Sequence, residues 1–279
     1  MRSRAIAHPA RHAFLRAMQP PMPNLIDAAL ALAWEEQGID RRDHVYALLA
    51  SMCQELDARI SPTLTPLDRL MTLNHYLFDE LGFKGNEDEY YAITNSYLDY
   101  VVVHRTGLPI ILSIIYIHLA QHVGVTCYGV AFPGHFMVQA RQAHGDPIII
   151  DPFRAGKRWS MSECANYLQR QRVSNDVHDW LAIPTAHDIM VRILRNIKGS
   201  HIMRGNFDQA AAALERMLQI NHAESIDIRD YGLILGRLGY YAQAVAYLER
   251  YAAMAPNAPD IESVRHHAQT ILRTAPKLN

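Results

Sequence analysis

Apolar residues recur at every third or fourth position through residues 24–81, and this period predicts a series of amphipathic helices. Asn24 and Thr65 stand where two of these helices would begin, because short polar side chains accept hydrogen bonds from the first unpaired backbone amides. Pro66 follows Thr65 at the first helical position, where its missing amide hydrogen costs nothing, and Gly82 marks a stop. We therefore expect this part of the chain to be helical.

The pattern changes after Gly107. The stretch that ends at Gly124 is apolar on every side, which predicts a buried helix. Ser160, followed three residues later by Glu163, forms a capping box that begins another helix. Between them lie three short apolar stretches that predict strands: "TCYGVAF", "HFMVQA" and "PIIID". Helices, then an antiparallel sheet, then helices again indicate an α+β fold.

The last third of the chain repeats itself with a period of 34 residues. The segment 205–221 aligns with 239–256, and the matches include glycines, small residues and the word Leu-Glu-Arg. Small residues at fixed positions let two helices pack closely. This period and pattern resemble tetratricopeptide repeats, so we expect an all-α repeat module.

Composition narrows the class of protein. Apolar residues make up 49% of the chain and charged residues 20%, and the net charge is −1. No overall field favours nucleic acid or an anionic membrane, and no apolar run is long enough for a membrane span. Three widely spaced cysteines do not form a disulfide framework, which favours a reducing cytoplasm.

His135 and Asp151 stand at the ends of two predicted strands. If the strands form a hairpin with a loop at 141–145, Phe136 faces Ile150 and His135 stands opposite Asp151. A carboxylate beside an imidazole orients the ring, which is the base-and-orienter half of a catalytic triad. The same pair is also a common structural hydrogen bond, so spacing alone leaves both interpretations open.

Four short words resemble the bacterial SirB-type family, in which a transglutaminase-like domain precedes tetratricopeptide repeats. They are Asn95-Ser96-Tyr97-Leu98, Arg105-x-Gly107-x-Pro109, the run "FPGHF" and Asp151-Pro152-Phe153. The arginines and the lack of acidic residues in the first 23 positions predict a basic N-terminal arm at 1–23. The resemblance implies a papain/transglutaminase-like domain at 24–185 and a repeat module at 186–279. It further implies that His135 and Asp151 match two members of a Cys-His-Asp triad.

The third member of that triad is missing. The superfamily's cysteine falls at the start of the buried helix, where this chain has Pro109, and the family implies that proline is usual there. Ser113, one turn further on, is expected to bond its own helix, and Cys127 is expected to pack in a strand. Cys164 is the sharpest substitute, because a helix N-terminus lowers the pKa of a thiol. Cys53 looks like core.

Other polar residues carry weaker hypotheses. His118 and His122 have the i, i+4 spacing of metal ligands, but no third ligand is evident, and neither a metal nor a cofactor is expected. Asn95, Arg105 and Gly134 are expected to line the groove beside the histidine.

Arg105 has two alternative roles in that groove. Its guanidinium could orient a ligand carboxylate, or it could form an ion pair with Asp99 or Asp151.

Three functional hypotheses follow. The leading one is a cytoplasmic, non-enzymatic protein that binds a protein or peptide partner through the concave face of residues 190–257. The second is an amide hydrolase or acyl transferase that uses His135, Asp151 and a non-standard nucleophile. The third is a purely structural scaffold.

Overall fold

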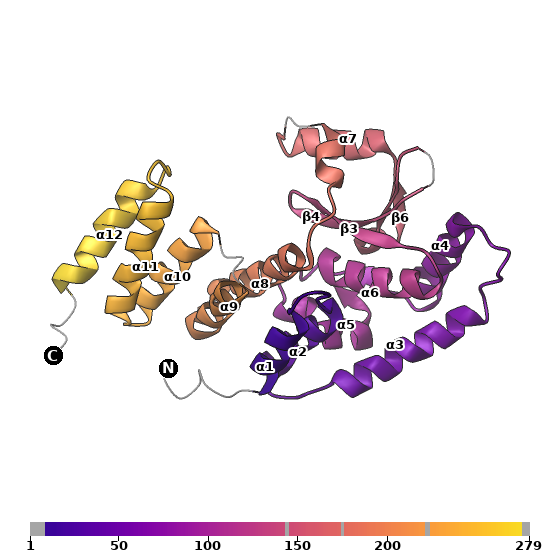
Figure 1. The fold of residues 1–279 in the computed structure, drawn as a ribbon, viewed down its shortest axis with the longest axis horizontal. Helices are drawn as coiled ribbons and strands as arrows, with labels where there is room; N and C mark the ends of the chain where they lie inside the picture. The colour runs from indigo at the N-terminus through magenta and orange to yellow at the C-terminus, as the bar shows by residue number, and fades with distance from the viewer. Residues whose placement is uncertain (1–8, 143–144, 174–175, 221–223, 275–279) are drawn as a thin grey trace. The chain divides into compact units, whose positions relative to one another are not determined.

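The computed structural model separates two compact units, residues 1–190 and 191–279 (Figure 1). The expected boundary at 185/186 coincides with the start of helix α8 (Ala186–Met203), and the units divide within that helix. The residues that the structure describes are 9–142, 145–173, 176–220 and 224–274.

Helices make up the first part of unit 1, as the apolar period predicts. They are α1 (Pro9–Ala17), α2 (Leu25–Gln37), α3 (Arg42–Asp57), α4 (Pro66–Asn74) with a π-helical turn (His75–Glu80), α5 (Leu98–His104) and α6 (Pro109–His122). Both predicted caps are confirmed. Asn24 accepts a hydrogen bond from the Asp27 amide at 3.1 Å, and Thr65 forms a reciprocal capping box with Asp68.

The N-terminal segment differs from the arm expected at 1–23. Residues 9–17 form α1, which packs against α2 and buries Phe14 completely. Arg11 donates to the Glu35 carboxylate at 2.8 Å, which ties the two helices together. The apolar face of this short helix was hidden in the sequence by its arginines. Residues 1–8 lie outside the described residues.

Two sheets follow from the middle of the chain. The larger is an antiparallel sheet with the order β3 (Cys127–Phe132), β4 (His135–Ala140), β5 (Ile148–Asp151) and β6 (Lys157–Trp159). The smaller pairs β1 (Lys84–Gly85) with β2 (Thr106–Gly107) in parallel. The sequence predicted β3, β4 and β5. It missed β1, β2 and β6, because strands this short show no alternation of apolar and polar residues.

The register of β4 against β5 corrects the predicted pairing. Val138, not Phe136, stands opposite Ile150, and the connection spans 141–147 rather than 141–145; residues 143–144 of this connection lie outside the described residues. The error is two residues. A shift of two keeps every side chain on its own face, so His135 and Asp151 remain on one face as diagonal neighbours.

The two faces of the large sheet are covered by different helices. Figure 1 shows α6 on one side of the sheet and α7 (Met161–Arg170) on the other. The face of the sheet that carries His135 and Asp151 is the one that α7 covers. Its core comprises Val130, Phe132, Met137, Ile149, Trp159, Cys164 and Leu168.

A line of hydrogen bonds joins the sheet to the helices through the turn after β5. The Gly156 amide donates to the Asp151 carbonyl at 2.9 Å. The Gly156 carbonyl in turn accepts from Asn74 Nδ2 at 2.9 Å, and Asn74 Oδ1 accepts from the Tyr116 hydroxyl of α6 at 2.7 Å. The end of β5 is therefore fixed to α4 and α6.

In the part of unit 2 that the structure describes, every regular element is a helix. Beyond α8 they are α9 (Phe207–Gln219), α10 (Ser225–Arg237), α11 (Tyr241–Met254) and α12 (Ile261–Thr274). Gly205 and Gly239 lie at corresponding turns with φ of 75° and 82°, and the matching Ala210 and Ala244 are both fully buried. The predicted helical repeat with small residues at its contacts is confirmed.

Gly156 should tolerate no side chain. Its φ is 69°, and an added Cβ would lie 2.5 Å from the Phe78 ring. Gly38 has a similar φ of 74° with no heavy atom nearby, so it isolates the backbone cost. We expect Gly156→Ala to lower the free energy of unfolding by about 1–3 kcal/mol more than Gly38→Ala, measured by urea denaturation. Equal losses would contradict this packing.

Candidate functional site

The imidazole of His135 and the carboxylate of Asp151 form a buried pair. His135 Nε2 lies 2.8 Å from Asp151 Oδ2. The side chain of His135 is 8% exposed and that of Asp151 is fully buried. In the observed register the two residues are diagonal neighbours on the same face of the sheet, and the bond joins them there.

The Asp151 carboxylate accepts hydrogen bonds from backbone amides as well as contacting the histidine. Its Oδ1 accepts hydrogen bonds from the amides of Phe153 at 3.1 Å and Arg154 at 3.3 Å, and so caps the 3₁₀ turn Pro152–Arg154. The Arg154 guanidinium also lies 3.8 Å from Oδ2. One carboxylate thus joins β5, the turn that follows it and the start of β4.

Aromatic rings surround the imidazole. The centroids of Phe153, Trp159 and Tyr167 all lie 6.0–6.3 Å from that of His135. The Tyr167 hydroxyl donates to the Pro133 carbonyl at 2.8 Å, which fixes α7 to the turn that precedes His135. Since Nε2 faces Asp151, any proton transfer to a substrate would have to pass through Nδ1, within this aromatic surround.

Pro109 is the first residue of α6 and is buried. The amide just before it, on Leu108, donates to the Asn95 carbonyl at 3.1 Å. The start of this helix is therefore well anchored, but Pro109 brings neither a thiol nor a hydroxyl to it.

Cys127 lies far from the pair along the strands. It stands opposite Ala140, whereas His135 stands opposite Phe132 at the other end of the same ladder. Five strand steps of about 3.3 Å separate the two ends by roughly 17 Å. Its side chain also points to the opposite face of the sheet, and burial raises its pKa to about 12. The packing role expected for Cys127 fits these observations.

Cys164 lies on the same side of the sheet as His135, but its side chain is completely buried. It belongs to the same core cluster as Val130 and Phe132. Burial first, and then the charge of Glu163, raise the pKa of its thiol to about 11. The expectation that the start of α7 lowers this pKa is wrong, because loss of hydration outweighs the helix N-terminus.

Two further expectations about hydroxyl and thiol groups are corrected. The Ser113 hydroxyl is fully buried and has no hydrogen-bond partner among the described residues, rather than being bonded to its own helix. Cys53 is half-buried at the edge of a surface pocket, rather than in the core.

The three residues expected to line a groove act in different places. Asn95 Nδ2 donates to the carbonyls of Glu89 and Tyr90 and so shapes the segment before α5. Arg105 donates to the Leu81 carbonyl at 2.8 Å. Gly134 adopts a φ of 67° in the turn between β3 and β4. A groove shared by all three stays a prediction.

The alternative ion pairs of Arg105 are not formed. Asp99 accepts hydrogen bonds from Arg41 and Gln37 instead, and the side chain of Asp151 is used by His135 and the turn after β5. The αL backbone of Arg105 at the end of α5 directs the guanidinium toward Leu81.

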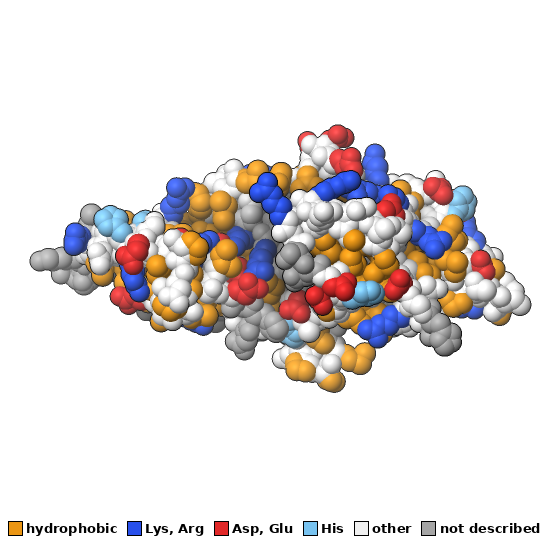
Figure 2. Space-filling view, turned by 90° about the horizontal axis from the view of Figure 1, so that it is seen from above, with side chains coloured by type: hydrophobic (Ala, Val, Ile, Leu, Met, Phe, Trp, Pro, Cys, Tyr) orange, Lys and Arg blue, Asp and Glu red, His pale blue; other side chains and the backbone are white. Residues whose placement is uncertain are grey.

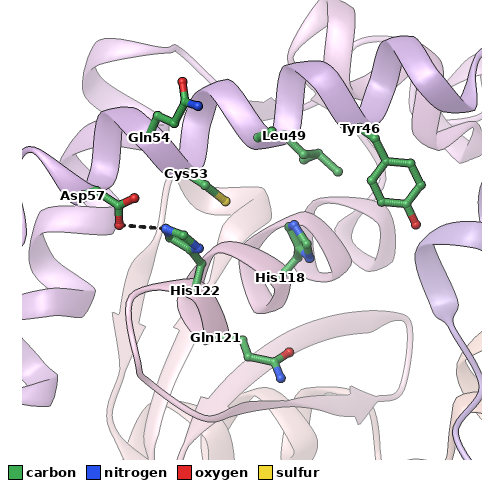
Figure 3. Close-up of a pocket in the computed structure, with 9 residues that line it drawn as sticks. Tyr46, Leu49, Cys53, Gln54, Asp57, His118, Gln121 and His122 are labelled. Carbon is green, nitrogen blue, oxygen red and sulfur yellow. Dashed lines mark hydrogen bonds and ion pairs between the residues drawn. The ribbon is translucent and has the colours of Figure 1, made fainter.

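The histidines of α6 lie beside α3. His118 and His122 line a pocket with Cys53 and Asp57 of that helix (Figure 3). His122 Nε2 is 2.8 Å from Asp57 Oδ1. Burial, and then neighbouring His122, lower the pKa of His118; burial, and then Asp57, raise the pKa of Cys53.

Sequence reasoning missed the aromatic residues that enclose His135. Trp159 comes immediately before the capping Ser160, and Tyr167 lies on the buried side of α7, between Cys164 and Leu168. The i, i+3, i+4 spacing of these residues marks a buried helix face. Only the fold shows that this face covers the histidine. Within the described ranges, no helix combines the length and apolar character needed to cross a bilayer.

The fold and the site define a transglutaminase-like protein that carries helical repeats. Residues 43–195 match the transglutaminase-like superfamily, and residues 197–269 match the tetratricopeptide repeat. UPF0162 proteins from two strains of Xylella fastidiosa are each 34% identical over 251 residues, 87% of this chain and 88% of theirs. The chain therefore belongs to the UPF0162 family, and the resemblance to the bacterial SirB-type family is confirmed.

A more distant relative is of a different kind. Human F-box only protein 21 is 32% identical over 179 residues, which is 62% of this chain but 28% of that protein. No solved structure is significantly similar to the chain.

Loss of the Asp151 carboxylate should destabilise unit 1. Asp151→Ala removes an acceptor for three donors, at about 1 kcal/mol each, so we expect a loss of about 3 kcal/mol in the free energy of unfolding. Asp151→Asn keeps one acceptor oxygen and should lose less. The exposed pair of His75 and Asp79 provides the control, because Asp79→Ala should change stability by at most about 1 kcal/mol. Similar urea midpoints for both alanine variants would contradict the buried role.

Proposed function

We propose that this protein is a non-catalytic member of the transglutaminase-like superfamily whose repeat module binds a protein partner. The observation that carries the first half is Pro109, which begins α6 where the superfamily's nucleophilic cysteine is expected. A proline side chain cannot attack an acyl group. His135 and Asp151 then serve as a structural remnant of the triad.

The surroundings of the pair support a structural use. A general base needs contact with substrate, whereas the His135 side chain is 8% exposed and flanked by three aromatic rings. Cys127 and Cys164 do not replace the missing nucleophile, because burial raises the pKa of each thiol and disfavours the thiolate.

The repeat module supports the second half of the proposal. Tetratricopeptide repeats generally mediate protein–protein interaction, and their stacked helices form extended binding surfaces. Along α10, Ile226, Arg229, Leu233 and Arg237 form a stripe that remains partly or fully accessible. This spacing suits a helix or an extended segment of another protein.

The charge distribution favours a protein over nucleic acid as the partner. Acidic and basic side chains are interspersed over the face seen in Figure 2, and the net charge is −1. Nucleic-acid binding draws on a concentration of positive charge. We place the protein in the cytoplasm, on the basis of its three free cysteines.

Thiol labelling tests the missing nucleophile. In the native protein at pH 8, we expect alkylation at Cys53, with Cys127 and Cys164 protected. The raised pKa of Cys164, about 11, alone lowers its thiolate fraction by about 100-fold. His135→Ala should leave the three rates unchanged. Fast, His135-dependent labelling of Cys164 or Cys127, or an acyl adduct in intact-mass spectra with acyl donors, would instead identify an enzyme.

Partner binding is tested on the full chain. Ile226→Ser with Leu233→Ser removes apolar contacts from the α10 stripe, and we expect a purified partner to bind at least tenfold more weakly, a loss of about 1.4 kcal/mol. Met71→Ser with Val103→Ser removes similarly exposed apolar groups from unit 1 and should leave the affinity unchanged. Unaltered binding by the α10 variant, measured by calorimetry, would exclude this surface.

A further inference from the structure

A surface pocket of about 520 Å³ lies on unit 1 between α3 and α6 (Figure 3). Its volume falls within the range of pockets that bind small organic molecules. The pocket shares no residue with the His135–Asp151 pair, with the aromatic rings around that pair or with the repeat module. The lining residues are Tyr46, Leu49, Ala50, Cys53, Gln54, Asp57, His118, Gln121 and His122.

The two ends of the pocket differ in polarity. Figure 3 shows Asp57 and His122 at one end and Tyr46 at the other, with Leu49 between them. The Tyr46 hydroxyl donates to Asp27 at 2.9 Å, so this residue offers the pocket its ring. Asp57 follows Tyr46 by 11 positions along α3, which is roughly 16 Å along the helix axis. The pocket therefore suits an elongated molecule with one polar end and one apolar end.

The polar end carries negative charge and no lysine or arginine. Asp57 Oδ1 lies 2.8 Å from His122 Nε2, whereas no described residue forms a hydrogen bond with Oδ2. Burial, and then His122, lower the pKa of His118, so this imidazole is neutral near pH 7. Burial, and then Asp57, raise the pKa of Cys53, so its thiol is neutral as well. Whichever form His122 takes, the lining carries no net positive charge.

We propose that this pocket binds a small organic amine, with its ammonium group at Asp57 and its apolar body along Leu49 toward the Tyr46 ring. An ammonium group carries only hydrogen-bond donors, and the carboxylate of Asp57 has an oxygen available to accept from it. The face of an aromatic ring packs well against an apolar body. A ligand with its own carboxylate would instead be repelled by Asp57.

Most of the affinity comes from the apolar body of the ligand. Asp57 is 66% exposed, and an ion pair with such access to water contributes little. Burial of alkyl surface raises affinity by about threefold for each CH₂ group. We therefore expect binding to strengthen along the series from ethylamine to hexylamine. The charge of Asp57 then selects among molecules of equal length.

The probe is hexylamine, titrated to millimolar concentrations into the full chain at pH 7 and low salt. Calorimetry should show one bound molecule per chain, held about threefold more tightly than hexanol and at least about tenfold more tightly than hexanoate or ethylamine. Equal affinities for hexylamine and hexanoate would overturn the proposal. Tighter binding of an N-acetylated tripeptide with a central lysine would assign the pocket to a protein side chain and overturn the choice of a free amine.

Variants test the place and the charge of the site. Asp57→Asn should lower the affinity for hexylamine about threefold and leave that for hexanol unchanged. Ala50 is exposed and lines the pocket, so Ala50→Trp should fill the space and abolish binding of both molecules.

Asp79→Asn is the matched control. The Asp79 carboxylate is 69% exposed and contacts His75 at 2.9 Å, much as Asp57 contacts His122, but it does not line the pocket. This variant should leave both affinities unchanged. A loss of hexylamine affinity equal to that of Asp57→Asn would reveal a general attraction of cations to surface acids and overturn the proposal.

Cys53 supplies an independent readout of occupancy. Cys127 and Cys164 are buried, so a disulfide reagent, which amines do not consume, reports Cys53 in the native chain. Saturating hexylamine should slow this reaction at least threefold in the native chain and in Asp79→Asn. An unchanged rate at saturation would place the amine elsewhere and overturn the proposal. Circular dichroism of each variant separates loss of binding from loss of fold.

Discussion

The Asp151 carboxylate is the interaction on which the architecture of unit 1 depends. It is fully buried, and it accepts hydrogen bonds from His135, Phe153 and Arg154. A buried carboxylate without such donors costs several kcal/mol, so each donor is constrained by the requirement to reach it. The backbone carbonyl of the same residue accepts from Gly156, which extends the constraint to α4 and α6. The sheet, the turn and the helices therefore meet at one residue.

This constraint explains why the histidine–aspartate pair was easier to predict than its register. Alternation of side chains tells which residues share a face, and a shift of two residues preserves that alternation. Asp151 nevertheless contacts His135 at hydrogen-bond distance in the observed register, in which Val138 and not Phe136 faces Ile150. Caps were predictable for a similar reason. Thr65 and Ser160 act through neighbours within three residues, so the local sequence contains the whole interaction.

What the sequence could not predict are the consequences of contacts between distant segments. The pKa of Cys164 is raised first by burial, in a core cluster that also contains residues of β3, and this burial outweighs the effect of the helix start. Cys53 looked like core because its helix is amphipathic, yet the periodic pattern does not show where the neighbouring helix leaves a pocket. Residues 9–17 were mispredicted in the opposite direction. The segment is rich in arginine and was expected to be an exposed arm, but Phe14 makes it part of the core.

Among the described residues of unit 1, His135 contacts Asp151 and His122 contacts Asp57 at the same distance of 2.8 Å, and the environments of these two pairs suit them to different tasks. His135 and Asp151 are buried beneath aromatic rings, where a polar pair stabilises a hairpin but has little access to solvent. His122 is 34% exposed and Asp57 66%, beside a second histidine and an accessible thiol. Burial strengthens a hydrogen bond and excludes ligands, whereas partial exposure weakens the bond and admits them. The buried pair therefore suits the stabilisation of the hairpin, whereas the pair between α3 and α6 is partly accessible from solution.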